Sequence, residues 1–124
     1  MGDSIMAGTL IADKWQNGDG TENYKCRAWV NFNGTGTVAI RESGNVSSIT
    51  DNGTGQYTVN FTTSMVDTNY AVGTTGNGSV DTFGSAGRQW YMLRIRATNY
   101  VQVNAVDDGG SNSDASFISV SIFR

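Results

Sequence analysis

The chain has 124 residues, a length that fits a single domain. Its net charge is −3 and only 15% of its residues are charged, so it lacks the basic surface that binds a phosphate backbone, and we expect no nucleic-acid partner. No apolar run approaches the roughly 20 residues of a membrane-spanning helix, so we expect no membrane insertion. The absence of histidine removes the usual catalytic triads and almost all zinc sites.

The first 24 residues differ from the rest of the chain. They begin with an acidic residue and have no sustained apolar stretch, so they do not resemble a signal peptide. Leu10, Ile11 and Trp15 are too few to form a core, and we expect them to pack against copies of themselves in an oligomer. The sequence therefore predicts a leader or stem over residues 1–24 and a folded domain over residues 25–124.

Residues 25–124 show the alternation of apolar and polar side chains that is typical of strands with one buried face. The clearest case is Gln56–Thr62, where Tyr57, Val59 and Phe61 alternate with polar residues. Turns rich in glycine and asparagine separate such segments, and DNGTG at 51–55 is a strong hairpin signal. Strands are predicted at residues 25–32, 37–42, 46–50, 56–62, 69–74, 89–96, 99–105 and 115–123.

Seven or eight short strands without a helix of three turns predict an all-β fold, a jelly-roll-like antiparallel β-sandwich. In the first strand Cys26 shares a face with Ala28, Val30 and Phe32, so we expect it to be a small core residue rather than a reactive thiol. Trp29 lies on the opposite face of this strand. A large aromatic there indicates that both faces are covered, the second one by another subunit.

The longest turn-rich stretch, residues 75–88, is followed by a strand that carries aromatic and arginine side chains. Aromatic rings stack on sugars while Asn, Asp and Arg bind hydroxyl groups, but Trp and Arg are also favoured at subunit interfaces, so both interpretations stay open. The predicted ligand-binding residues are Phe83, Arg88, Trp90, Tyr100, Asp107 and Asp108. The predicted interface residues are Leu10, Ile11, Trp15, Trp29, Arg94 and Arg96.

The acidic turn at 107–114 is the part of the sequence to examine for a catalytic pair of carboxylates or for a metal site. A glycosidase needs two carboxyl groups that face each other across a cleft, and adjacent aspartates in a tight turn do not naturally do so. The turn could hold calcium, but it lacks EF-hand spacing and is better explained as an ordinary solvated turn. We predict no catalytic residue, no metal and no cofactor.

One long stretch resembles a known family. Residues 27–65, RAWVNFNGTGTVAIRESGNVSSITDNGTGQYTVNFTTSM, followed by DTNYAV at 67–72, resemble tail-fibre and virion-appendage domains of tailed bacteriophages, particularly marine and cyanobacterial phages. The closing ASFISVSIF is similar to the last strand of such domains, and TLIADKWQNGDGT at 9–21 is similar to their stem segments. Residues 75–114 match nothing in the family, and receptor-contacting loops are expected to vary there.

The resemblance implies a non-enzymatic structural protein of the phage particle, made in the host cytoplasm and assembled as a homotrimer. It would bind a host-surface glycan or protein, and residues 1–24 would contact other virion tail or capsid proteins. Tail fibres usually have an anchoring domain and a shaft, and this chain has neither. Three interpretations therefore stay open: a short fibre, an accessory tip or a capsid decoration protein. Further alternatives are a polysaccharide-degrading appendage enzyme and a cell-surface adhesion module.

Overall fold

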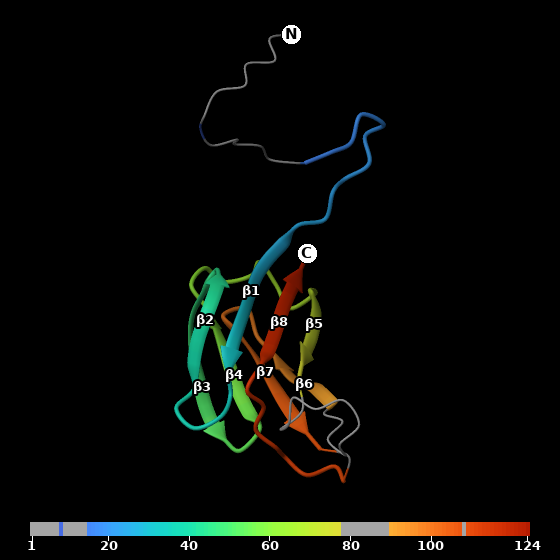
Figure 1. Cartoon of the computed structure of the whole chain (residues 1–124). Helices are drawn as coiled ribbons and strands as arrows, with labels where there is room; N and C mark the ends of the chain where they lie inside the picture. The colour runs from blue at the N-terminus through green and yellow to red at the C-terminus, as the bar shows by residue number, and fades with distance from the viewer. Residues whose placement is uncertain (1–7, 9–14, 78–89, 108) are drawn as a thin grey trace.

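The computed structural model describes residues 8, 15–77, 90–107 and 109–124, with only the backbone of 90–92 (Figure 1). Its described residues form eight antiparallel strands in two four-stranded sheets, which confirms the predicted all-β sandwich. None of these residues belongs to a helix that could cross a membrane. The strands are β1 (Cys26–Asn33), β2 (Ala39–Gly44), β3 (Val46–Gly53), β4 (Gln56–Phe61), β5 (Ala71–Gly76), β6 (Trp90–Arg96), β7 (Tyr100–Val106) and β8 (Ile118–Phe123).

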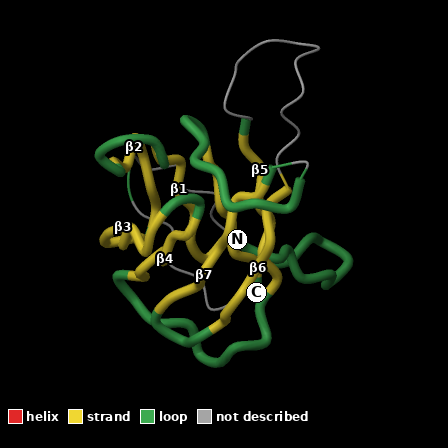
Figure 2. Tube along the Cα trace, turned by 90° about the horizontal axis from the view of Figure 1, so that it is seen from below, coloured by secondary structure: helices red, strands yellow, loops and turns green. Residues whose placement is uncertain are grey.

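The two sheets form separate layers, which are seen from below in Figure 2. The first sheet has the strand order β2-β1-β8-β5 and the second has the order β3-β4-β7-β6. Hairpins join β1 to β2, β3 to β4 and β6 to β7, whereas β1–β8 and β4–β7 are long-range pairs at the sheet centres. The first and last strands of the sandwich therefore lie side by side in the middle of the first sheet.

The core fills the space between the two sheets. It is made by the alternate apolar residues of β1, β4, β7 and β8, because these central strands each turn one face inward. Phe32 from the first sheet and Tyr57 from the second meet edge to face, with ring centroids 5.2 Å apart. The fully buried large side chains are Tyr57, Phe32, Ile118, Ile122, Val30, Val59, Val101, Val103 and Val120.

A buried hydroxyl group connects three loops at one end of the sandwich. The hydroxyl of Tyr57 lies 2.8 Å from the carbonyl oxygen of Gly34 and 2.9 Å from the Oδ1 of Asp114. The backbone N–H of Gly55 donates to the same Oδ1 at 2.7 Å. Burial, and then the neighbouring Asp114, raise the pKa of Tyr57 well above the usual 10.0. A Cβ at Gly34 would lie 2.5 Å from the Tyr57 hydroxyl oxygen, so glycine is required there.

Bulges turn two predicted inward residues toward solvent. The β1–β8 register shifts between Cys26 and Ala28, and Cys26 is exposed rather than part of the core, so that prediction was wrong. The β6–β7 register shifts between Leu93 and Ile95, which leaves Ile95 44% exposed although the alternation of β6 placed it with the inward residues. A further register shift lies in β3, between Val46 and Ser48.

Residues 15–25 extend away from the sandwich as a small hairpin-like segment (Figure 1). A bridge pairs Gln16 with Glu22, and the N–H of Asn23 donates to the carbonyl oxygen of Trp15 at 2.6 Å. Trp15 is 60% exposed, so it does not pack on the sandwich. Leu10 and Ile11 lie outside the described residues, and their predicted role in an oligomer stays a prediction.

Candidate functional site

A groove of about 480 Å³ lies on the outer face of the first sheet, where β1, β8 and β5 run side by side. The strand register builds it in two rows. One row consists of Trp29, Ser121 and Gly73, and the next consists of Asn31, Ser119 and Thr75. These side chains face outward because the intervening residues, Val30 and Val120 among them, point into the core. We call this hollow the Trp29 groove.

Trp29 forms the wall of the groove on the side of β2. It pairs with Gly44, and a Cβ at Gly44 would collide with the indole nitrogen. The indole therefore lies across a residue without a side chain, and Trp29 stays 41% exposed. On the other side of the groove Gly73 has no side chain, so it leaves the floor open. A Cβ at this position would lie 3.0 Å from the Oγ of Ser121 and would narrow the groove.

A chain of polar contacts runs from the β2 edge into the groove. Arg41 donates from Nη1 to the Oδ1 of Asn31 at 3.4 Å, and Asn31 donates from Nδ2 to the Oγ of Ser119 at 3.0 Å. The guanidinium carbon of Arg41 also lies 3.9 Å from the ring centroid of Phe117, a cation–π contact. Phe117 is itself 43% exposed, so this end of the face presents both an aromatic ring and a positive charge.

The groove is suited to a ligand that has an apolar face and several hydroxyl groups. The Trp29 indole offers a surface for stacking, while serine, threonine and asparagine offer neutral donors and acceptors. Within the described part of the chain, the hydroxyl groups of Ser121 and Thr75 make no side-chain hydrogen bond. The described residues that line the groove include no acid, base, cysteine or tyrosine. Such a lining supports binding rather than proton transfer.

A second hollow, of about 290 Å³, lies on the outer face of the second sheet beside Arg94. Its amide groups are largely engaged with each other and with neighbouring hydroxyl groups. The Oγ1 of Thr58 accepts from the Nδ2 of Asn52 at 2.7 Å and from the Nε2 of Gln102 at 3.2 Å, and Asn104 donates to Asn112 at 3.3 Å. A ligand here would have to compete with these bonds, so this face is the weaker candidate.

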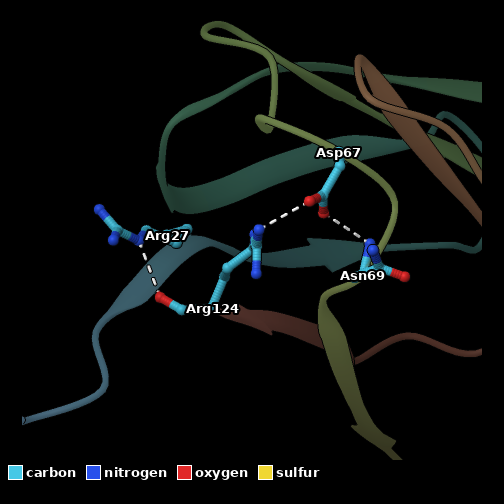
Figure 3. Close-up of polar contacts among 4 residues, drawn as sticks. All are labelled: Arg27, Asp67, Asn69 and Arg124. Carbon is cyan, nitrogen blue, oxygen red and sulfur yellow. Dashed lines mark hydrogen bonds and ion pairs between the residues drawn. The ribbon is translucent and has the colours of Figure 1, made fainter.

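A third hollow, of about 270 Å³, lies beside Arg27 and Arg124 near the end of β8. Figure 3 shows the polar contacts that these two arginines make there. The Nη2 of Arg124 pairs with the Oδ2 of Asp67 at 2.6 Å, and the Nε of Arg27 donates to the carbonyl oxygen of Arg124 at 3.0 Å. The Oδ1 of Asp67 accepts from the N–H of Asn69 at 2.8 Å. These contacts connect the end of β8 to β1 and to the β4–β5 connection, so we interpret them as structural.

The predicted ligand-binding residues do not form one described cluster. Tyr100 begins β7 and Asp107 follows its other end, so the two lie at opposite ends of the second sheet. Asp107 accepts the N–H groups of Gly109 and Ser111, both at 2.9 Å, within its own turn. The backbone of Trp90 pairs with Val106, close to Asp107. Phe83, Arg88 and Asp108, together with the side chain of Trp90, lie outside the described residues.

The predicted interface residues are also divided. Trp29 faces outward from the first sheet, whereas Arg94 and Arg96 are exposed on β6 of the second sheet. Among the predicted site residues that the structure describes, Trp29 is therefore the one that lines the groove. Sequence reasoning missed Asn31, Gly73, Ser119 and Ser121 as possible partners of this tryptophan. The alternation of small polar residues in ASFISVSIF marked one face of the last strand, but no local signal placed that strand beside Trp29.

Comparisons of the chain with protein-family models, curated proteins and solved structures give no match. Among the described residues, no three histidine, cysteine or acidic side chains lie close enough together to hold a metal ion. The geometry of the Trp29 groove is therefore the main basis for assigning a function.

Proposed function

We propose that this chain is a non-catalytic attachment domain that binds a glycan on a host cell surface. The observation that carries the proposal is the Trp29 groove, a concave surface of about 480 Å³ with an exposed indole wall and a floor of serine, threonine and asparagine side chains. A sugar ring has an apolar face that stacks on an aromatic ring and a rim of hydroxyl groups that need neutral hydrogen-bonding partners. The groove offers both on one rigid sheet.

The proposed setting is the appendage of a phage particle, with the domain assembled as a homotrimer and attached through residues 1–24. The resemblance of residues 27–72 to tail-fibre domains supports this setting. Residues 15–25 extend from the sandwich at the end where β1 starts, which suits a stem (Figure 1). The groove lies on the outer face of a sheet, so a surface glycan could reach it without entering a deep pocket.

The test is binding of the whole chain to an array of purified bacterial capsular polysaccharides and lipopolysaccharide O-chains, followed by titration calorimetry of the glycans that bind. We expect Trp29→Ala to weaken binding at least about fivefold, because removal of a stacked aromatic ring costs about 1–3 kcal/mol. Trp15→Ala is the matched control, since Trp15 is 60% exposed and is not among the described residues that line the groove. Equal loss in both variants, or no glycan bound by the native chain, would refute the proposal.

A second candidate function uses the same face as a contact between virion subunits, as in a decoration or cement protein. Three aromatic side chains of this sheet, Trp29, Phe117 and Phe123, are between 41% and 43% exposed, and exposed aromatic residues are common at interfaces. Sedimentation of native chain and of Trp29→Ala separates the two candidates. A native trimer that dissociates in the variant, together with no glycan binding by either, would favour the contact.

A further inference from the structure

We propose that the ligand of the Trp29 groove is an acidic glycan whose carboxylate or sulfate group is bound by Arg41. The inference rests on the proposed glycan binding, because it assigns a charge to the same ligand. It is carried by the position of the Arg41 guanidinium group at the border of a groove whose described lining residues are uncharged.

Arg41 is held in place without a carboxylate partner. Among the described residues the one ion pair joins Arg124 to Asp67, and Arg41 instead contacts the ring of Phe117 and the amide of Asn31. The guanidinium group lies over the Phe117 ring, and the Asn31 amide oxygen accepts from one of its Nη1–H groups. A guanidinium group has five N–H donors in a planar fork, so donors remain that suit the paired oxygens of a carboxylate or a sulfate. The Arg41 guanidinium group is thus positioned at the border of the groove with N–H donors left for an anionic group of a ligand.

The groove and Arg41 are close enough to share one ligand. Asn31 lines the groove, and it connects Arg41 to Ser119 on the groove floor through its two amide atoms. Trp29 and Asn31 are two residues apart on one face of β1, a separation of about 7 Å. When one saccharide unit stacks on Trp29, a substituent of the adjacent saccharide unit therefore lies beside Arg41.

A neighbouring acidic residue limits how much negative charge the ligand can carry. Glu42 pairs with Asn31 across β1 and β2, and its Oε1 accepts from the N–H of Ser43 at 3.3 Å. The chain as a whole also has a net charge of −3. A densely charged polyanion would be repelled, whereas a glycan with one acidic group in its repeat would meet Arg41 alone. Removal of the Glu42 charge should therefore strengthen binding of the acidic ligand.

The experiment uses the whole chain and the same array of capsular polysaccharides and O-chains, with each glycan that binds also prepared in carboxyl-reduced and desulfated forms. These two treatments distinguish a uronic acid from a sulfate ester as the source of charge. Binding constants are measured by calorimetry for native chain, Arg41→Gln, Glu42→Gln and Trp29→Ala. Arg94→Gln serves as the matched control, because Arg94 is an exposed arginine on the second sheet.

We expect the native chain to select acidic glycans and to bind them about tenfold more weakly after Arg41→Gln, as is typical when a charged hydrogen bond is lost. Neutralising the ligand should produce the same loss in native chain and no further loss in Arg41→Gln. Glu42→Gln should tighten binding, and Arg94→Gln should not change it. Two results would refute this inference but not the proposed glycan binding. One is that binding needs Trp29 but the bound glycans are neutral, and the other is that Arg41→Gln binds the acidic glycan as tightly as the native chain does. If no glycan binds native chain, both fall.

Discussion

Tyr57 offers a direct test of how the end of the sandwich is held together. Its side chain is 1% exposed, and its hydroxyl contacts the Gly34 carbonyl oxygen at 2.8 Å and the Asp114 carboxylate at 2.9 Å. Tyr57→Phe keeps the ring and its packing against Phe32 but removes both hydrogen bonds. The loss leaves the buried Gly34 carbonyl group without this donor, whereas Asp114 retains the N–H of Gly55 at 2.7 Å.

The expected cost is about 2 kcal/mol of the free energy of unfolding, because a buried polar group without a partner costs roughly 1–3 kcal/mol. It is measured by urea unfolding followed by circular dichroism. Tyr24→Phe is the control, since Tyr24 is 80% exposed and its hydroxyl group makes no hydrogen bond to a described residue. If Tyr57→Phe changed the free energy of unfolding no more than Tyr24→Phe does, the hydroxyl would not be what connects these loops.

The same variant predicts a change in pH dependence. Burial and the neighbouring Asp114 raise the pKa of Tyr57 in the folded chain above the ordinary 10.0. Above about pH 10 the unfolded chain therefore releases the Tyr57 proton while the folded chain still keeps it. Its contribution to stability is therefore complete below about pH 10 and declines as the pH rises above that value, by up to about 1.4 kcal/mol per pH unit. Tyr57→Phe should reduce this alkaline slope. Some slope should remain, because burial also raises the pKa of Tyr70.

Three further predictions concern the outer surface. Gly44→Ala should displace the indole of Trp29, because the added Cβ would collide with it. The indole N–H resonance of Trp29 should then shift in the NMR spectrum, and glycan binding should fall at least about fivefold. Gly73→Leu should fill the groove and abolish calorimetric binding, while the unfolding midpoint changes little because β5 is an edge strand. Asp67→Asn should cost less than about 1 kcal/mol in urea unfolding, since its ion pair with Arg124 is more than one-third exposed; a larger cost would contradict its treatment as a surface pair.

The sequence predicts most of the strands because their alternation is strong and local. Val101, Val103 and Ala105 of β7 point inward as their spacing predicts, and so do Ile118 and Val120 of β8. The predictions fail where a bulge adds one residue, since a shift of one residue reverses which side chains face the core. Neither the composition nor the spacing of the residues marks the bulges at Cys26 and Ile95.

The groove could not be predicted, for a different reason. Trp29 and Ser121 are neighbours because β1 pairs with β8, and Gly73 joins them because β5 pairs with the other edge of β8. These pairings connect residues that are far apart in the sequence, and strand order is not written in the local pattern. Sequence reasoning therefore identified Trp29 as an outward aromatic residue but assigned it to a subunit contact, without the serine and glycine residues that give it a groove.

The two outer faces of the sandwich differ in how the polar groups of their described residues are used. On the second sheet Asn60 bonds to Ser48 and Thr50, so neutral side chains satisfy one another across adjacent strands. On the first sheet, within the described residues, Ser121 and Thr75 have no side-chain partner and Trp29 is held open over Gly44. A face whose groups are already paired gains little from a ligand, whereas unpaired hydroxyl groups beside an exposed indole gain new contacts on binding. This difference supports the proposal that the first sheet carries the ligand-binding face.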